Sequence, residues 1–163
     1  MKKIILLLSL VCLMGVSVQA EENILAQAEQ KAEEKINDYL TETGVFFLAT
    51  ALDKQPHLRP LGMHFIMDGK LWFGVGDQKE VYKQLKKNPL VEIVALKKDN
   101  HWLRYSGKVV FAMDQKYAQK ALEMSPYLKE IYNSKTGHKL MMFYVEDATA
   151  LDMSIDGKSQ VIL

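Results

Sequence analysis

The apolar residues before position 44 follow two successive patterns. A basic pair, Lys2-Lys3, precedes an apolar run that ends in small residues at Ala20. From Leu25 to Leu40, apolar residues then recur every three or four positions opposite a charged face, and Gly44 follows. These patterns predict a cleavable signal peptide over residues 1–20, followed by an N-terminal amphipathic helix that ends near Gly44.

Most of the remaining chain consists of apolar segments of strand length. Extended segments are expected at 45–52, 57–67, 71–75, 91–96, 101–113, 140–145 and 150–155. Asp68-Gly69 is a strong two-residue hairpin signal. Short helices are expected around 81–85, over 117–122 after a capping Asp114, and over 126–132. Strands with inserted helices and no regular strand–helix alternation indicate an α+β fold with an antiparallel barrel or sandwich core, and disfavour a parallel nucleotide-binding sheet.

Size, charge and cysteine content narrow the class of protein. Removing 20 of the 163 residues leaves 143, the size of one domain, so residues 21–163 are expected to form a single domain. The net charge near zero suggests neither nucleic acid nor an anionic membrane as a partner.

Cys12 would leave with the signal peptide, which excludes thiol chemistry in the mature domain. Lipidation of Cys12 is the alternative, but Val11 stands where a small residue would be needed. We expect an exported protein, periplasmic or secreted, without stable membrane insertion after cleavage.

The first candidate site is the segment from Leu71 to Lys79, where a strand ends in two glycines, Gly74 and Gly76, and leads directly into a helix. Glycines let a ligand approach the backbone, and the amides of a first helical turn attract anions. Lys79 is expected in this first turn, where it would add a cation suited to phosphate. Asp77 is expected to cap the helix, paired with Glu80 three residues on. The simpler interpretation is a capped surface helix with a solvated lysine.

Two further candidates lie in extended segments. Arg59 precedes Pro60, whose missing amide hydrogen suits an edge strand or bulge and leaves backbone groups free. Trp102 and Arg104 share one strand face by their spacing of two, and could supply an aromatic wall and a guanidinium. The alternatives are a salt-bridged arginine and a rim tryptophan. The four histidines show no ligand spacing, so no metal site is expected, and no side chain stands out as a catalytic acid, base or nucleophile.

Five segments together resemble the pyridoxamine-5′-phosphate-oxidase-like family in order and spacing. They are Phe47-Leu48-Ala49-Thr50, Pro56-His57-Leu58-Arg59-Pro60, Leu71-Trp72-Phe73-Gly74, the block from Lys79 to Asn88-Pro89, and Trp102-Leu103-Arg104-Tyr105-Ser106-Gly107. The resemblance covers roughly residues 40–150. It implies an antiparallel split β-barrel with peripheral helices, a homodimer, and flavin mononucleotide (FMN) bound in clefts between subunits.

The resemblance also implies roles for individual residues. Lys79 and Arg59 would contact the phosphate, and Gln84 would approach the polar groups or ribityl chain of the flavin. Pro60, Leu61 and Gly62 would pass along the isoalloxazine ring, while Trp102 and Arg104 would close the cleft, from the partner subunit if need be. The C-terminal segment that grips the substrate in true pyridoxamine-phosphate oxidases has no counterpart here, so another small-molecule substrate or electron donor is expected. The alternative is a non-catalytic flavin- or haem-binding protein that uses the same cleft.

Overall fold

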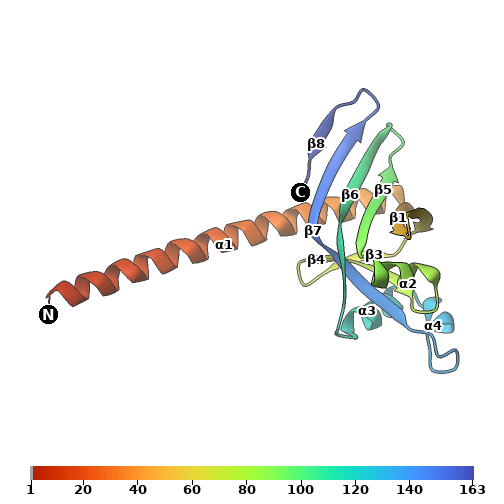
Figure 1. Ribbon diagram of the computed structural model, residues 1–163, viewed down its shortest axis with the longest axis horizontal. Coiled ribbons are helices and arrows are strands. Elements are labelled where there is room, and N and C mark those ends of the chain that lie inside the picture. Colours follow the sequence, from red (N-terminus) through yellow and green to blue (C-terminus); the bar gives the residue numbers. More distant parts are fainter. Residues whose placement is uncertain (1) are drawn as a thin grey trace.

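The computed structural model describes the backbone of residues 2–163 and the side chains of residues 19–163. Its elements are α1 (Lys2–Thr43), β1 (Phe46–Leu52), β2 (Gln55–Leu61), β3 (His64–Met67), β4 (Lys70–Gly76), α2 (Glu80–Lys87), β5 (Leu90–Leu96), β6 (His101–Phe111), α3 (Lys116–Met124), α4 (Leu128–Ile131), β7 (Leu140–Ser154) and β8 (Ser159–Val161). The strands form one antiparallel sheet in the order β2-β1-β5-β6-β7-β4-β3, with β8 beside β7. The predicted α+β fold with an antiparallel split barrel and peripheral helices is confirmed (Figure 1).

Helix α1 projects from the barrel at its N-terminal end and packs against it at its C-terminal end (Figure 1). Ala32, Ile36 and Leu40 are buried on the barrel side of the helix, as the spacing of apolar residues predicted, whereas Leu25 at the start of the predicted face is exposed. The helix ends where expected, at Gly44, which adopts a positive φ of 71° and donates its amide to Leu40 O at 2.9 Å.

The start of α1 differs from the prediction, because the helix is continuous from Lys2 rather than beginning after Ala20. Met1 and the side chains up to residue 18 lie outside the described part of the chain, so the signal peptide stays a prediction. Among the helices that the structure describes, none is both long and apolar enough to cross a membrane.

The sheet buries apolar side chains on both of its faces. The barrel interior is filled from α1, β1, β4, β5, β6 and β7, by residues such as Phe46, Phe73 and Phe143. A second cluster lies on the opposite face of β4 and β7, beneath α3 and α4, and includes Trp72 and Met142. Strand β4 is therefore buried on both sides, which explains its almost continuous apolar sequence.

The turns and strand limits correct several expectations. Asp68 and Gly69 both have positive φ, 53° and 72°, which confirms the predicted hairpin between β3 and β4. The segment expected over 57–67 is two strands, β2 and β3, separated at Gly62-Met63. The two strands expected over 140–145 and 150–155 are one strand, β7, which stays paired with β6 across a bulge near Gly107. Strand β8 was not predicted.

Candidate functional site

A cavity of about 640 Å³ lies between the edge strand β2, the end of β4 and the start of α2. Its lining includes five of the eight residues that the sequence singled out: Arg59, Pro60, Leu61, Lys79 and Gln84. Gly74, Gly76, His57 and Tyr132 also line it. A volume of this size is typical of a small-molecule or cofactor site.

Arg59 lies at the inner side of this cavity and bonds only to neutral groups. Its Nη1 donates to Thr50 Oγ1 at 2.8 Å and to Leu48 O at 3.2 Å, and its Nη2 donates to Gln84 Oε1 at 2.7 Å. Burial lowers the pKa of the guanidinium. No carboxylate pairs with Arg59 among the residues that the structure describes, so the salt-bridged alternative is wrong. A partly buried cation without a counter-ion favours an anion in the cavity.

Gln84 and Thr50 fix the position of the Arg59 guanidinium. Both side chains are buried, and Thr50 donates its hydroxyl to Gln84 Oε1 at 2.7 Å. Because Oε1 accepts from both Thr50 and Arg59, the amide nitrogen of Gln84 remains as a donor for other groups. Sequence reasoning missed the role of Thr50. The signal that could have indicated this role is the polar Thr50 at an inward position of an otherwise apolar strand.

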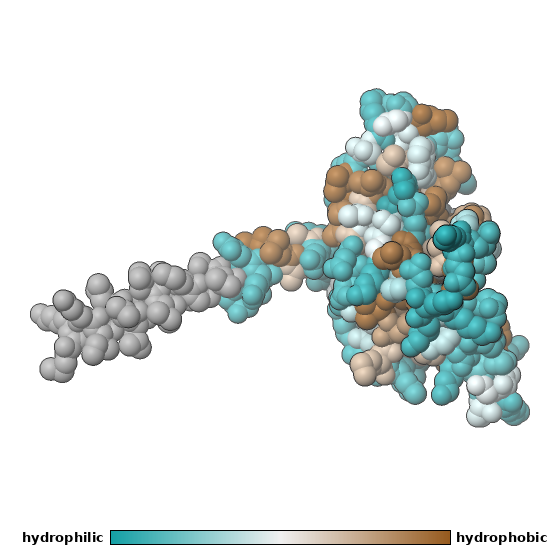
Figure 2. All heavy atoms as spheres, in the orientation of Figure 1, coloured by the Kyte–Doolittle hydropathy of each residue, from teal (hydrophilic) through white to brown (hydrophobic). Residues whose placement is uncertain are grey.

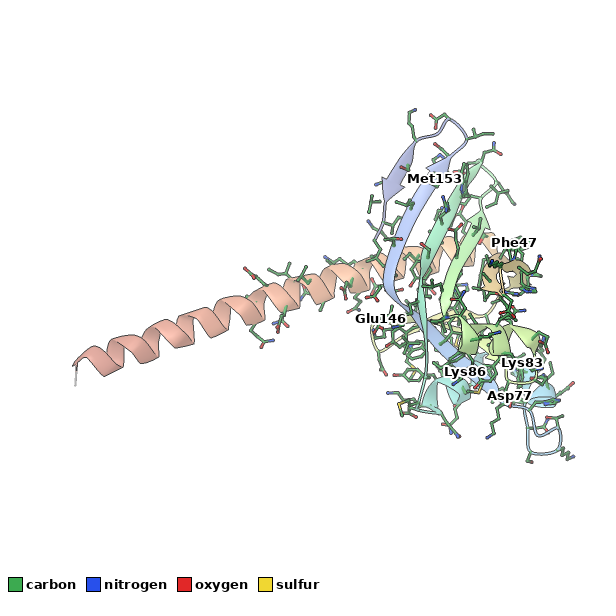
Figure 3. All side chains as sticks on the ribbon, in the orientation of Figure 1. Phe47, Asp77, Lys83, Lys86, Glu146 and Met153 are labelled. Carbon is green, nitrogen blue, oxygen red and sulfur yellow. The ribbon has the colours of Figure 1, made fainter. Side chains whose placement is uncertain are left out.

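Lys79 stands at the start of α2, where its exposed side chain lines the cavity. It is the N-cap residue itself, in extended conformation, and not a member of the first turn. The expected cap by Asp77 is wrong, because the Asp77 carboxylate accepts the backbone amide of Lys139 at 2.9 Å. Asp77 thus ties the turn before α2 to the start of β7. Figure 3 shows Asp77, Lys83 and Lys86 around α2, and Figure 2 shows that hydrophilic side chains gather over this region.

Glycine at position 76 keeps the end of β4 open. A Cβ on Gly76 would lie 2.8 Å from the hydroxyl oxygen of Tyr132, which approaches from the segment after α4. Tyr132 is therefore a wall of the cavity that lies far from β4 in the sequence. No local pattern indicated it, because only the tertiary fold brings the two segments together.

The other three predicted residues do not line this cavity in one subunit. Gly62 lies in the link between β2 and β3, where a Cβ would meet Gly44 O at 3.4 Å. Trp102 and Arg104 do share one face of β6, and both lie on the outside of the sheet. Arg104 forms a two-bond ion pair with Glu92, at 2.7 and 3.1 Å, which raises the pKa of the guanidinium. In the described residues, no group of three or more His, Cys, Asp or Glu side chains could hold a metal ion.

The fold and this cavity define a split-barrel protein with a pocket suited to an anionic small molecule. The family profile described as pyridoxamine 5′-phosphate oxidase matches residues 32–154, which is more than half of the chain. The chain therefore belongs to the pyridoxamine 5′-phosphate oxidase family, as the resemblance implied. No curated protein gives a significant sequence match.

Solved structures of the same fold agree with this assignment. A NimC/NimA family protein from Clostridium acetobutylicum is 30% identical, with a TM-score of 0.75, over 83% of this chain and 94% of that one. An FAD-binding protein from Mesorhizobium loti is 19% identical, with a TM-score of 0.50, over 72% and 92% of the two chains. A heme binding protein from Mycobacterium smegmatis is 17% identical, with a TM-score of 0.58, over 82% and 56%. The last two similarities concern the fold alone.

Proposed function

We propose that this protein is an exported, homodimeric flavoprotein that binds FMN and acts as an oxidoreductase on a small molecule. The observation that carries the proposal is the Arg59 guanidinium, which lines the cavity without a carboxylate partner in the described part of the chain. Family membership and the FAD-binding neighbour support a flavin as the ligand. Export rests on the predicted signal peptide, and its test is the N-terminal sequence of the protein recovered outside the cytoplasm.

The residues of the cavity fit the parts of FMN. Arg59 and Lys79 would neutralise the phosphate, and the free amide nitrogen of Gln84 would donate to an oxygen of the ribityl chain or ring. Pro60 and Leu61, with Gly62 beyond the cavity, would follow the isoalloxazine along the edge strand. Bound FMN would supply one- and two-electron redox chemistry, while this chain binds the cofactor and orients its ring.

The outer face of the sheet supports the homodimer. In register across β1, β5, β6 and β7, one row carries Phe47, Val94, Arg104 and Leu151, and the next row carries Leu96, Trp102 and Met153. Phe47 is 44% exposed and Leu96 65% exposed on this one face. Exposed apolar side chains gathered on one face are typical of a protein–protein contact. Figure 3 labels Phe47 and Met153 of this face. A second copy seated here would bury the apolar rows and carry its own Trp102 and Arg104 toward the cofactor cleft.

The phosphate assignment is tested by comparing FMN with riboflavin. Lys79→Ala should weaken FMN binding about tenfold to a hundredfold, since a charge-assisted hydrogen bond contributes roughly 1.5–3 kcal/mol. Its affinity for riboflavin should stay close to that of the wild type, and added salt should weaken FMN binding alone. Lys86→Ala is the matched control, because Lys86 is exposed on α2 and does not line the cavity. Equal wild-type affinity for FMN and riboflavin would refute the phosphate site.

Sedimentation at low micromolar concentration tests the dimer. We expect a homodimer that FMN stabilises further, because a ligand that contacts both subunits favours their association. Leu96→Glu, on the outer face, should shift the protein toward monomers and weaken FMN binding at the same time. Wild-type protein that stays monomeric with and without FMN would contradict the shared cleft.

A haem-binding function is the second candidate, favoured by His57 in the cavity wall and by the heme binding neighbour. The visible spectrum of purified protein separates the two. FMN gives flavin bands that bleach on reduction, whereas haem gives an intense Soret band that His57→Ala should alter.

A further inference from the structure

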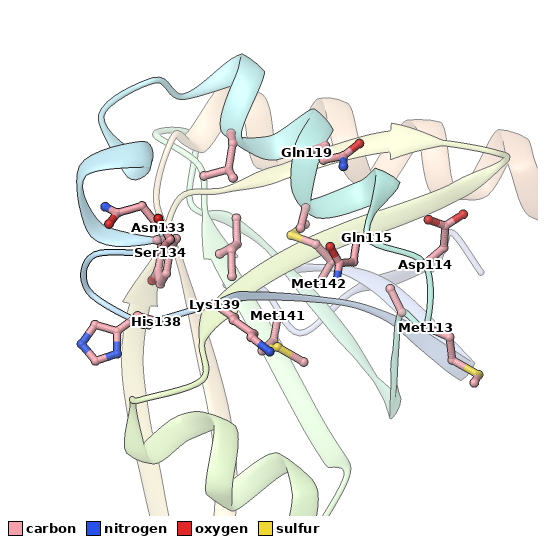
Figure 4. Close-up of a pocket in the computed structure, with 16 residues that line it drawn as sticks. Met113, Asp114, Gln115, Gln119, Asn133, Ser134, His138, Lys139, Met141 and Met142 are labelled. Atoms are coloured by element: carbon pink, nitrogen blue, oxygen red, sulfur yellow. The ribbon is translucent and has the colours of Figure 1, made fainter.

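A second cavity, of about 490 Å³, lies on the α3 side of the sheet. It is enclosed by α3, by the loop of residues 133–139 and by the first residues of β7 (Figure 4). Its wall is largely apolar, with Leu122, Leu140, Met141 and Met142 among the side chains that line it. Methionine side chains adapt to ligands of varied shape, and this size suits a small organic molecule.

The second cavity adjoins the proposed flavin cavity through paired strands. Gly74, Val75 and Gly76 of β4 line the first cavity, and they pair in register with Met142, Met141 and Leu140 of β7, which line the second. Tyr132 lines both cavities. Burial raises the pKa of its phenol, so the hydroxyl remains protonated at neutral pH. A ligand in the second cavity would therefore lie one strand away from the flavin, beside a hydroxyl donor.

The polar groups of the second cavity favour a ligand with oxygen acceptors. Lys139 is exposed on the lining and forms no ion pair within the described part of the chain. Asp114, the one carboxylate on the lining, already accepts the backbone amide of Lys116 at 2.8 Å. Asn133 is also committed, because its amide nitrogen donates to Lys129 O and Glu130 O. Gln115, Gln119, Ser134 and His138 also line the cavity and can donate hydrogen bonds. With the ammonium of Lys139 and the hydroxyl of Tyr132, the lining therefore offers more donors than carboxylates.

We propose that this second cavity binds the redox partner of the flavin, an apolar small molecule with carbonyl oxygens, of the quinone class. The proposal rests on the proposed flavin function. The exchange would balance as reduced FMN and quinone giving oxidised FMN and hydroquinone, so bound FMN would supply the two electrons and two protons that the quinone gains. Leu122 and the methionines contact the apolar body of the ligand, and Lys139 contacts a carbonyl oxygen.

Binding of menadione, a naphthoquinone, to the protein without flavin tests the cavity directly. Trp72 is a suitable reporter, because its ring stacks on Tyr117 of α3 at 3.8 Å and Ala118 of the same helix lines the cavity. In a Trp102→Phe background, menadione should quench this emission with saturation. Ala118→Phe, which fills the cavity, should weaken binding at least tenfold, and Lys139→Met should weaken it several-fold. Lys120→Phe on α3 and Lys135→Met in the loop are the matched controls, since neither residue lines the cavity.

The affinity for FMN, measured on the same substitutions with Trp102 retained, separates this inference from the proposed function. Unchanged FMN affinity with weakened menadione binding in Ala118→Phe and Lys139→Met supports the second cavity as the quinone site. Menadione binding that fails to saturate, or that neither substitution alters, overturns the inference even where FMN binds. If the protein binds menadione in a way that Ala118→Phe weakens but has no affinity for FMN, the cavity is a ligand site. The proposed electron exchange with the flavin is then overturned.

Discussion

Glu33 should make the stability of the protein fall as the pH rises through neutrality. This residue lies on α1 where the helix docks on the barrel, and its Oε1 accepts the hydroxyl of Tyr105 at 3.3 Å. Its Oε2 is buried without a hydrogen-bond partner. Burial raises the pKa of the carboxyl from 4.5 to about 7, against the opposing effects of Tyr105 and Lys70. The folded state therefore holds a proton on Glu33 that the unfolded chain has lost.

The sign and the size of the effect follow from this pKa shift. Between pH 4.5 and about 7 the folded state binds more protons at Glu33 than the unfolded state does, so its contribution to stability is full below pH 4.5 and is lost toward pH 7. The whole shift corresponds to about 3.4 kcal/mol at roughly 1.36 kcal/mol per pH unit. Because the side chain is partly exposed, solvent screening reduces the expected change to about 1–3 kcal/mol.

Urea unfolding of the wild type and of Glu33→Gln at pH 5 and pH 8 measures this change. Glutamine has nearly the same shape, can accept the Tyr105 hydroxyl and does not ionise. Relative to the wild type, Glu33→Gln should gain about 1–3 kcal/mol of unfolding free energy between pH 5 and pH 8. Glu34→Gln, one position along on the exposed side of α1, should show no such gain. A difference between Glu33→Gln and the wild type that stays constant with pH would refute the reasoning.

Two further predictions concern the bulge and the outer face. Gly107→Ala should lower the unfolding free energy by about 1–3 kcal/mol, because the new Cβ would lie 2.6 Å from Val145 Cγ1 and 2.7 Å from Glu146 O. Gly137→Ala is the control: its Cβ would meet open space, so it should lower the unfolding free energy by only about 1 kcal/mol, through its positive φ. Trp102→Phe should brighten the emission of bound FMN if the partner's copy of this residue walls the flavin. Unchanged emission and unchanged FMN affinity would leave Trp102 as a rim residue that shields the core.

The sequence predicted the elements of the fold better than their limits. The apolar spacing of α1 and the Asp68-Gly69 turn depend on local geometry, and both predictions are confirmed. The gap expected inside β7 is wrong because a polar stretch, Glu146-Asp147, marks a bulge in a continuous strand rather than its end. A short polar stretch in the sequence is compatible with either a bulge or a loop, and only the pairing with the neighbouring strand distinguishes them.

The candidate site was predictable only where its residues belong to family-like segments. Arg59, Lys79 and Gln84 come from three separate segments, and the fold brings them to one cavity. The place of Tyr132 in the cavity wall and the failure of Asp77 to cap α2 were not predictable. The first depends on the approach of Tyr132 to Gly76, and the second on the amide of Lys139. Asp77 resembles a helix cap in the sequence, but the amide of Lys139 competes successfully for its carboxylate.

The contrast between Arg59 and Arg104 shows why charge alone could not separate a ligand contact from a surface ion pair. Both arginines stand on strands, in segments of similar composition. Arg104 has Glu92 within 2.7 Å on the neighbouring strand, and its charge is neutralised on an exposed face. The hydrogen bonds of Arg59 in the described structure go to a carbonyl, a hydroxyl and an amide oxygen, which orient the guanidinium but leave its charge in place. The oriented and uncompensated cation is therefore the stronger candidate for binding an anionic cofactor within one subunit, while Arg104 can contribute only where a second subunit draws it from Glu92.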